Sequence, residues 1–476
     1  MLHYALQVPS ANHTGEVLDV HSPYDGKLVG KVDVLDAQGA EQAMQNTEQL
    51  FADRDGWLSA EKRIAVLERA ASIMQERFDE LVDIAVSEGG KPLNDSRVEV
   101  VRAIDGMKSC VECIRTDHGT EIPMNLNAAS SNRIAYTQKE PRGVVLAFSA
   151  FNHPLNLIVH QVGPAIASGC PVIIKPASDT PLSAFVMCEI LLEAGLPEGW
   201  CQAIVLTDLD IAGDMVADKR IAFFSFIGSG RVGWMLRSKL APGTHCALEH
   251  GGVAPAIVAE DADLADSLPL LAKGGFYHAG QVCVSVQRIF AHADIIDQIA
   301  NGLVEYAGQA IVGDPADENT EIGPLIRKQE IDRIHSWVEE AVAEGATLLC
   351  GGKALGESTY APTVLLNPGT DSKVSQQEIF GPVICVYSYD DMNQAIEQAN
   401  ALPFAFQASI FTANINTAMY ASKRLAAATV MVNDHTAFRV DWMPFAGLRE
   451  SGYGIGGIPY TFEDMQIEKL TVIRTF

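Results

Sequence analysis

The segment Ile221-Ala222-Phe223-Phe224-Ser225-Phe226-Ile227-Gly228-Ser229-Gly230-Arg231-Val232-Gly233 joins a mostly apolar run to a glycine-rich turn. The apolar run has the length of a buried strand, and residues 234–240 after the turn have a helical pattern. The glycines match G-x-G-x-x-G between a strand and a helix, which is typical of a loop that holds a dinucleotide pyrophosphate at a helix N-terminus. A glycine-rich turn without a ligand fits the same residues, so both interpretations stay open at this point.

Short apolar runs alternate with segments of helical length on both sides of the glycine loop. We expect buried strands at residues 143–148, 171–174, 202–206, 221–227 and 254–258, and a second series at 284–291, 347–349, 383–387, 408–411 and 429–432. Such alternation predicts parallel sheets with helices on both faces. The sequence therefore predicts the α/β class with two Rossmann-like domains, which meet near Glu249.

The segments before this region have a different pattern. Residues 42–86 and 98–114 carry apolar side chains three and four positions apart, as in amphipathic helices that cover a sheet. Residues 117–142 are polar and contain many turn formers, so we expect a loop or hairpin there.

The composition excludes several classes of protein. A chain of 476 residues is too long for one compact core, and 48% hydrophobic with 20% charged residues is typical of a soluble globular protein. Acidic residues outnumber basic ones 60 to 34, and the net charge of −26 argues against a nucleic-acid partner. We find no targeting segment and no apolar run that could span a membrane, so we expect a cytoplasmic protein without a membrane partner.

The cysteines and histidines suggest no metal site. Nine scattered cysteines do not form a disulfide framework and fit a reducing compartment. Cys110 and Cys113 have C-x-x-C spacing, but no second pair lies at zinc-finger distance, and no H-E-x-x-H sequence is present. We therefore expect no metal.

Six motifs, spread along the chain, need a single explanation. They are Phe148-Ser149-Ala150-Phe151-Asn152-His153-Pro154, Lys175-Pro176-Ala177-Ser178, Leu248-Glu249-His250-Gly251-Gly252, Gly280-Gln281-Val282-Cys283, Glu378-Ile379-Phe380-Gly381-Pro382-Val383 and Pro444-Phe445-Ala446-Gly447. In this order, over residues 17–472, they resemble the aldehyde dehydrogenase superfamily. Each motif alone is a weak signal, and the six together are highly specific.

The resemblance implies oxidation of an aldehyde to a carboxylic acid with NAD or NADP. It makes Cys283 the nucleophile, which must make the carbonyl carbon tetrahedral before a hydride can leave. It makes the Asn152 side chain and the Cys283 backbone N–H the donors that stabilise the resulting alkoxide. It makes Glu249 the general base that activates water to hydrolyse the thioester.

The resemblance also implies a cofactor site. Lys175 is similar to the residue that reaches the adenosine ribose, and Gly228 and Ser229 are similar to residues at the pyrophosphate. Glu378 and Phe380 resemble the residues that hold the nicotinamide ribose and ring, and Phe151 and Ser178 are assigned to this site too. Ser178 stands where many NAD-preferring members carry Glu, so a 2′-phosphate is admissible and Arg231 is a candidate to pair with it. We therefore expect NAD or NADP.

The implied substrate pocket is formed by His160, Val282, Val284 and Phe445. His160 stands where an aromatic residue is frequent, which suggests a small hydroxylated or anionic aldehyde. Residues 277–288 are similar to the group that includes lactaldehyde, phosphonoacetaldehyde and sulfolactaldehyde dehydrogenases. His250 and His278 replace the usual Leu and Asn, which leaves the hydrogen bonding near Glu249 and Cys283 open.

The resemblance gives expected domain boundaries. Residues 1–122 and 142–248 form a cofactor-binding domain, residues 249–440 a catalytic domain, and residues 441–457 a segment that returns to the cofactor domain. Residues 123–141 and 458–476 form oligomerisation strands, which implies a homodimer or homotetramer.

Three other interpretations remain. An acylating enzyme would pass the thioester to coenzyme A, although such members commonly lack a base at the position of Glu249. An inactive relative would bind the nucleotide without turnover. A conventional Rossmann protein would use Glu249, roughly 20 residues after the glycine loop, on the cofactor ribose.

Overall fold

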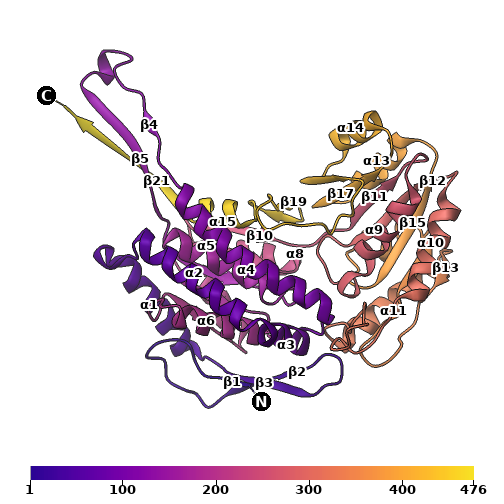
Figure 1. Ribbon diagram of the computed structural model, residues 1–476, viewed down its shortest axis with the longest axis horizontal. Helices are drawn as coiled ribbons and strands as arrows, with labels where there is room; N and C mark the ends of the chain where they lie inside the picture. Colours follow the sequence, from indigo (N-terminus) through magenta and orange to yellow (C-terminus); the bar gives the residue numbers. More distant parts are fainter. Residues whose placement is uncertain (1, 476) are drawn as a thin grey trace.

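The structure is a computed structural model that describes residues 2–475, arranged as two α/β lobes and a projecting arm (Figure 1). The first lobe is formed by the N-terminal half of the chain, and the second by residues after Glu249. Met1 and Phe476, at the ends of the expected cofactor-binding domain and oligomerisation segment, lie outside the described residues.

A six-stranded sheet forms the centre of the first lobe, in the order β20-β10-β9-β6-β7-β8. Its strands are β6 (Val144–Phe148), β7 (Val172–Lys175), β8 (Cys201–Ala203), β9 (Ile221–Ile227), β10 (His245–Glu249) and β20 (Gly452–Tyr453). All neighbours are parallel except β20, which comes from the C-terminal region and pairs antiparallel with β10. Along β6, Val145 and Ala147 pack on one face and Leu146 on the other, so every side chain of this strand is buried.

Helices cover both faces of this sheet. They are α1 (Ala37–Ala52), α2 (Ala60–Glu76), α3 (Phe78–Gly89), α4 (Leu93–Thr116), α5 (Asn156–Ser168), α6 (Leu182–Glu193), α7 (Leu209–Ala217), α8 (Gly230–Arg237) and α15 (Ile458–Asp464). One face is packed by α2 to α6 and α15, and the other by α1, α7 and α8. A small sheet of β1 (Leu2–Tyr4), β2 (Val17–His21) and β3 (Leu28–Asp33) lies at the edge of this lobe (Figure 1).

The second lobe has a seven-stranded sheet in the order β13-β14-β15-β12-β11-β17-β18, with only β13 antiparallel. Its strands are β11 (Ala254–Val258), β12 (Val286–His292), β13 (Thr347–Cys350), β14 (Thr363–Leu366), β15 (Val383–Tyr389), β17 (Gln407–Phe411) and β18 (Thr429–Val432). The helices of this lobe are α9 (Leu264–Phe276), α10 (Ile296–Gln309), α11 (Lys328–Ala343), α12 (Lys373–Gln376), α13 (Met392–Asn400) and α14 (Ile415–Arg424). One continuous apolar core joins these helices and strands.

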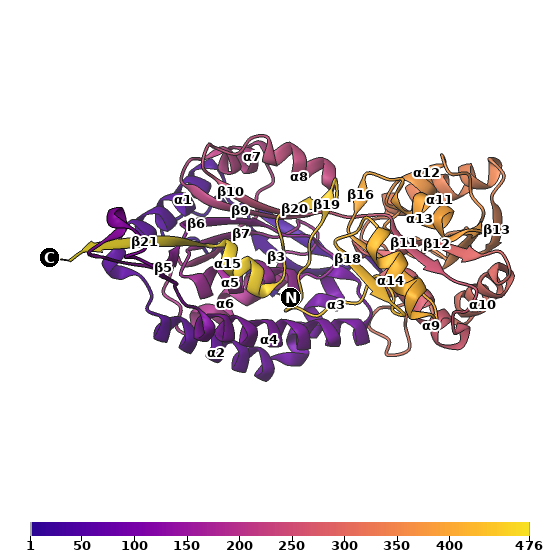
Figure 2. The same ribbon diagram turned by 90° about the horizontal axis from the view of Figure 1, so that it is seen from above.

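The arm is an antiparallel sheet of β4 (Glu121–Ile122), β5 (Arg133–Pro141) and β21 (Gln466–Arg474). It projects away from the first lobe, and the C-terminus lies at its tip (Figures 1 and 2). The register pairs Gln466 with Pro141 and Arg474 with Arg133, so two segments more than 300 residues apart run side by side over their whole length. Two short strands, β16 (Phe404–Ala405) and β19 (Leu448–Arg449), pair between the second lobe and the returning C-terminal segment.

The expected α/β class is confirmed, with two mainly parallel sheets and a small antiparallel one. Every strand expected in the two large sheets exists within a few residues, and β11 belongs to the second sheet. The expected oligomerisation strands are strands only at residues 133–141 and 466–474, because residues 458–464 form the helix α15, which packs its apolar side chains into the core of the first lobe. In these two sheets β10, β14 and β20 were not expected, because their apolar runs of three residues or fewer are shorter than the usual strand signal. Among residues 2–475, no helix is both long enough and apolar enough to cross a bilayer.

Candidate active site

A cavity of about 1020 Å³ lies between the two lobes. The carboxyl ends of the parallel strands β7, β6, β9 and β10 open onto it, which is where ligands bind in open α/β sheets. The second lobe contributes the segments just before β12 and β15. Cys283, Glu249 and Asn152, which come from three separate parts of the chain, all line this cavity.

Cys283 lies on a tight loop three residues before β12. Gln281 anchors the loop, because its side chain donates to the carbonyls of His278 and Pro324 and accepts from the Ile326 N–H. His278 and Ala279 have φ values of 48° and 53°, in the left-handed region that non-glycine residues rarely adopt. The thiol is therefore held in place by a strained and strongly tethered turn.

The thiol of Cys283 is half-buried, and burial raises its pKa to about 12. The positive charge of Arg439 acts in the opposite direction, while Glu249 and Glu378 add to the rise. At neutral pH the sulfur is therefore protonated, and its proton must leave before or during attack on a carbonyl.

Asn152 lies on the loop that connects β6 to α5, and it is 6% exposed. Its Nδ2 donates a hydrogen bond of 2.9 Å to the carbonyl of Gln281, two residues before the cysteine. A primary amide has two N–H donors, so the second one remains for a ligand near Cys283. The bond to Gln281 also fixes the orientation of this side chain relative to the loop of the thiol.

Glu249 is the last residue of β10, and its side chain is 13% exposed. Burial raises the pKa of its carboxyl above the ordinary glutamate value of 4.5, although the guanidinium of Arg439 at 4.0 Å opposes the rise. A Cβ on Gly456 would lie only 1.9 Å from the Glu249 Oε1 atom. The carboxylate therefore occupies space that exists only because residue 456 has no side chain.

This contact yields a test. Replacing Gly456 with alanine should displace the Glu249 carboxylate and lower kcat by about 10- to 100-fold, because sub-ångström placement of a reacting group is worth rates of this size. Steady-state kinetics and a thermal melt would measure the change. Gly308→Ala in α10 is the matched control, since a Cβ there would meet nothing within 4 Å. An unchanged kcat in Gly456→Ala would contradict the importance of this position.

Glu378 and Phe380 precede β15 and reach the cavity from the second lobe. The Glu378 carboxylate accepts a 3.2 Å hydrogen bond from the Gly252 N–H, and burial raises its pKa to about 8. A Cβ on Gly251 would lie 1.8 Å from Glu378 Oε1, so the glycine pair after Glu249 makes room for this carboxylate. Phe380 meets Phe151 edge to face, with ring centroids 5.8 Å apart.

Lys175 and the glycine loop line the first-lobe side of the cavity. Lys175 ends β7, and burial lowers the pKa of its amine. Gly228 and Ser229 lead into the N-terminus of α8, where unpaired backbone N–H groups favour an anion. Ser178 is exposed, and its neighbours Ala177 and Asp179 line the cavity. These residues fit a dinucleotide that lies along the strand ends.

His250 explains one glycine of the sequence pattern. Its Nδ1 donates 3.0 Å to the Gly228 carbonyl, and a Cβ on Gly233 would lie 1.9 Å from the imidazole. The side chain packs against Phe226 and Trp234 on the side of α8. The third glycine of G-x-G-x-x-G therefore accommodates His250.

His278 is also buried, and burial holds the pKa of its imidazole well below the ordinary value.

Val282, Val284 and Phe445 form a small apolar cluster with Phe406 beside Cys283. The first three line the cavity, at the positions expected for the substrate pocket. His160, expected in the same pocket, lies behind its wall: it is 3% exposed and is absent from the lining. His160 belongs to α5, whose residues are all buried. Its imidazole can therefore influence the cavity only through the side chains that it contacts.

Arg439, which was not expected at the site, lines the cavity close to both Cys283 and Glu249. No motif marks this residue, since it lies in the irregular segment between β18 and the Pro444-Phe445 motif. Arg102 of α4, which was treated only as part of an amphipathic helix, also lines the cavity.

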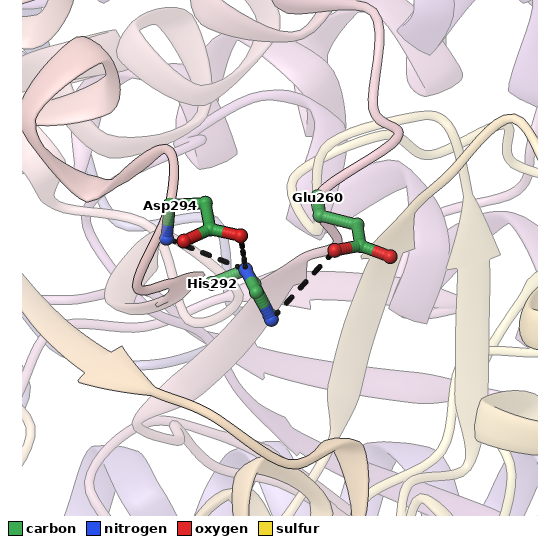
Figure 3. A group of neighbouring side chains, drawn as sticks. All are labelled: Glu260, His292 and Asp294. Atoms are coloured by element: carbon green, nitrogen blue, oxygen red, sulfur yellow. Dashed lines mark hydrogen bonds and ion pairs between the residues drawn. The ribbon is translucent and has the colours of Figure 1, made fainter.

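Among residues 2–475, one group of three side chains has an arrangement that could hold a metal ion, at the far end of β12. His292 lies between Asp294 and Glu260 (Figure 3), with nitrogen-to-oxygen distances of 3.6 Å and 4.0 Å. Both carboxylates are exposed, and none of the three residues lines the cavity. These are the contacts of an exposed ion-pair cluster, and we base no metal site on them.

The family model that describes the aldehyde dehydrogenase family matches residues 10–470 of the chain. The chain belongs to the aldehyde dehydrogenase family. It is 37% identical over 461 residues to the 3-sulfolactaldehyde dehydrogenase of Priestia aryabhattai, an alignment that covers 97% of this chain and 96% of the relative.

Solved structures of other aldehyde dehydrogenases have the same fold. Aldehyde dehydrogenase 21 of Physcomitrella patens, in complex with the reaction product succinate, superposes with a TM-score of 0.95 at 34% identity and covers 99% of this chain and 98% of that one. The glyceraldehyde-3-phosphate dehydrogenase of Methanocaldococcus jannaschii, complexed with NADP, gives 0.91 at 33% identity, with 96% and 99% covered.

The protein is therefore an NAD(P)-dependent aldehyde dehydrogenase, as the resemblance implied. The expected family, enzyme class and cofactor pair, NAD or NADP, are confirmed. The roles of individual residues in this aldehyde dehydrogenase rest on the geometry of the cavity described above.

Proposed function

We propose that the protein oxidises an aldehyde to a carboxylic acid through a covalent thioester on Cys283. The observation that carries this proposal is that a thiol, an amide donor and a raised-pKa carboxylate meet in one cavity that also has the features of a dinucleotide site. No two of Asn152, Glu249 and Cys283 lie on the same element, so the fold rather than local sequence brings them together.

In the first step the Cys283 thiol releases its proton to solvent water as the sulfur bonds to the carbonyl carbon, and the carbonyl oxygen becomes an alkoxide. The free N–H of the Asn152 amide and the backbone N–H of Cys283 stabilise that charge. This gives a thiohemiacetal, and its carbon can now release a hydride. NAD or NADP supplies the hydride acceptor when it is bound.

Several residues are suited to hold that cofactor in place. Lys175 and the N-terminus of α8, with Gly228 and Ser229, would bind its ribose and pyrophosphate. Glu378 and the facing rings of Phe151 and Phe380 lie on the opposite side of the cavity, where they would orient the nicotinamide end. The exposed Ser178 leaves space for a 2′-phosphate, so both NAD and NADP fit.

In the last step Glu249 removes a proton from water, the oxygen attacks the thioester carbon, and the carboxylic acid leaves as the thiol reforms. The raised pKa makes this carboxylate a stronger base than an exposed glutamate. Its neighbour His250 points to the Gly228 carbonyl and takes no part in this step.

The pH dependence follows from the direction of the Glu249 shift. Only the ionised carboxylate can act as base, so kcat should fall as the pH drops through a pKa above 4.5 when hydrolysis limits the rate. Steady-state rates between pH 5 and 9 would show this acid limb. Thiol ionisation also favours high pH, and a pre-steady-state measurement of the first turnover separates its pH dependence from that of hydrolysis by Glu249. A flat kcat across this range, with hydrolysis limiting, would count against Glu249.

We propose a small hydroxylated or anionic aldehyde as substrate. Relatives named for 3-sulfolactaldehyde and glyceraldehyde-3-phosphate support this, as does a solved relative bound to succinate. Lactaldehyde, phosphonoacetaldehyde and sulfolactaldehyde should therefore be oxidised faster than hexanal and benzaldehyde, with NAD and NADP assayed in parallel. A clear preference for the two apolar aldehydes would overturn this proposal.

The same assay addresses the alternative chemistries. With coenzyme A present, an acylating enzyme would yield an acyl thioester, whereas we expect the free acid because Glu249 lines the cavity with Cys283. An inactive relative would form no NAD(P)H with any aldehyde.

We also propose that residues 1–122 and 142–248 act as the cofactor-binding domain and residues 249–440 as the catalytic domain, with residues 441–457 returning to the first. The pairing of β20 with β10 supports the return. We propose that the arm, whose strands β5 and β21 lie within the expected oligomerisation segments 123–141 and 458–476, joins copies of the chain into a dimer or tetramer. Exposed apolar side chains on its strands, including Ile134, Leu470 and Val472, support this. A monomer in sedimentation velocity would contradict it.

A further inference from the structure

Arg439 is a buried cation whose donors are largely unused. Its side chain is 10% exposed, and it lines the cavity with Cys283 and Glu249. One Nη2 hydrogen goes to His160 Nδ1 at 3.2 Å, and Nη1 lies 4.0 Å from Glu249, beyond hydrogen-bond distance. Its Nε is buried without a hydrogen-bond partner among residues 2–475. A guanidinium has five N–H donors, and a buried one normally has its charge and donors matched.

The side chain is held firmly in spite of these free donors. The Cζ atom of its guanidinium lies over the Phe445 ring, 3.6 Å from the centroid. His160 Nε2 lies 2.7 Å from Asp441 Oδ1, and because a carboxylate only accepts, this nitrogen carries the hydrogen. The Nδ1 atom is then free to accept from Arg439. Burial, followed by the charge of Arg439, lowers the pKa of His160 to about 4, which keeps the ring neutral at pH 7.

The same carboxylate orients a second cation. Arg102 of α4 donates to Asp441 through Nε at 3.1 Å and Nη2 at 2.6 Å, which leaves Nη1 for the cavity that this residue lines. Burial acts to raise the pKa of Asp441, but His160 and Arg102 outweigh it and hold the pKa well below its usual range. One ionised aspartate therefore positions two guanidiniums, Arg102 directly and Arg439 through His160.

The charges in this part of the cavity do not cancel. Asp441 offsets Arg102, to which it is bound at 2.6 Å. Among residues 2–475, the one carboxylate within ion-pair distance of Arg439 is Glu249, at 4.0 Å. A small anion would supply the missing partner, and the polar Asn156 side chain beside Asp441 also lines this wall.

We propose that Arg439, supported by Arg102, binds an anionic group of the aldehyde substrate: a carboxylate, sulfonate or phosphonate a few bonds from the carbonyl carbon. The substrate is short, because Arg439 lies within 4.0 Å of the carboxylate proposed to activate water. His160 and Asp441 are positioning residues that act through Arg439. This inference rests on the proposed aldehyde oxidation, and it narrows the substrate from hydroxylated or anionic to anionic.

The test compares matched aldehydes with and without the anion. Wild-type enzyme should have a kcat/KM for 4-oxobutanoate and phosphonoacetaldehyde well above that for butanal. Arg439→Met should lower the ratio of kcat/KM for each anionic aldehyde to kcat/KM for butanal by about 10- to 100-fold, the worth of charge-assisted hydrogen bonds. The relative loss for the carboxylate and the phosphonate shows which anion the site favours. Arg439→Lys should recover part of the loss, since it keeps the charge but not the planar donors.

The alternative role for Arg439 is to lower the pKa of Cys283 or Glu249, and it predicts a different result. In that case Arg439→Met would reduce kcat for butanal and 4-oxobutanoate equally, which would overturn the anion site. His160→Asn should lower the preference for anions by raising KM for 4-oxobutanoate more than KM for butanal. Arg97→Met, a half-exposed arginine on the same helix as Arg102, is the matched control, and a thermal melt checks that each variant is folded.

A binding measurement separates this inference from the proposed function. Succinate, titrated into wild type and Arg439→Met by calorimetry, should bind the variant about 10-fold more weakly, whether or not any aldehyde is turned over. Equal affinities would overturn the anion site while the aldehyde oxidation stands. Absence of NAD(P)H with every aldehyde, together with weakened succinate binding in the variant, would overturn the oxidation and leave the anion site.

Discussion

Replacing Cys283 with serine should reduce kcat/KM for aldehyde oxidation by about 10,000-fold or more, the size of effect seen when an enzyme loses its nucleophile. Aldehydes have no leaving group, so a hydride can depart only after the carbon becomes tetrahedral. A serine hydroxyl is harder to ionise than a thiol, and the cavity has no base strong enough to ionise it. NAD(P)H formation and cofactor binding, measured separately, would show that chemistry and not binding is lost.

Cys113→Ser provides the control for this experiment, because Cys113 is also half-buried but lies on α4 away from the cavity. Wild-type enzyme quenched during turnover should carry an acyl group on the peptide that contains Cys283. Turnover of the serine variant at the wild-type rate, or an acyl group on any other side chain, would exclude the thioester mechanism.

Replacing Glu249 with glutamine should stall the enzyme after one turnover. The amide preserves the size of the side chain but cannot accept a proton, so the hydride step should proceed and thioester hydrolysis should slow by about 100- to 10,000-fold. We expect a burst of NAD(P)H equal to the active sites, followed by a slow steady state, and accumulation of acylated Cys283 in mass spectra.

This variant also distinguishes two roles for the same carboxylate. If Glu249 bound the cofactor ribose, the glutamine variant would show a raised Kd for NAD or NADP and no burst. We expect an unchanged cofactor Kd, because the carboxylate lies against Gly456 and near Arg439 at the substrate end of the cavity. Glu450→Gln, an exposed glutamate on the returning C-terminal segment, should behave as wild type.

Much of the fold was predictable because parallel strands buried on both faces are continuous apolar runs. Residues 221–227, 254–258 and 429–432 were expected as strands and have those bounds in the structure. The strand β10 was missed because its apolar run, Cys246 to Leu248, is only three residues long, although the strand carries Glu249 at its end. Its place in the sheet comes from pairing with β9 and β20, which a local pattern does not encode.

The roles of two glycines and a histidine depended on contacts across the fold. Gly233 matches a dinucleotide pattern in sequence, yet the side chain it accommodates is His250. Gly456 belongs to no motif, yet the Glu249 carboxylate occupies the space beside it. The resemblance placed His160 in the substrate pocket, where an aromatic residue is frequent, but its imidazole faces Asp441 and Arg439 behind the pocket wall.

The sequence by itself determined the α/β class, the order of the strands along the chain and the six motifs that identify the family, because these depend on residues close together in the chain. Only the tertiary structure decided how Arg102, His160, Arg439 and Asp441 meet, since more than 330 residues separate the first from the last. Their hydrogen bonds depend on distances set by the packing of α4 and α5 against a distant loop. The charge that we propose to select the substrate is therefore a property of the folded chain.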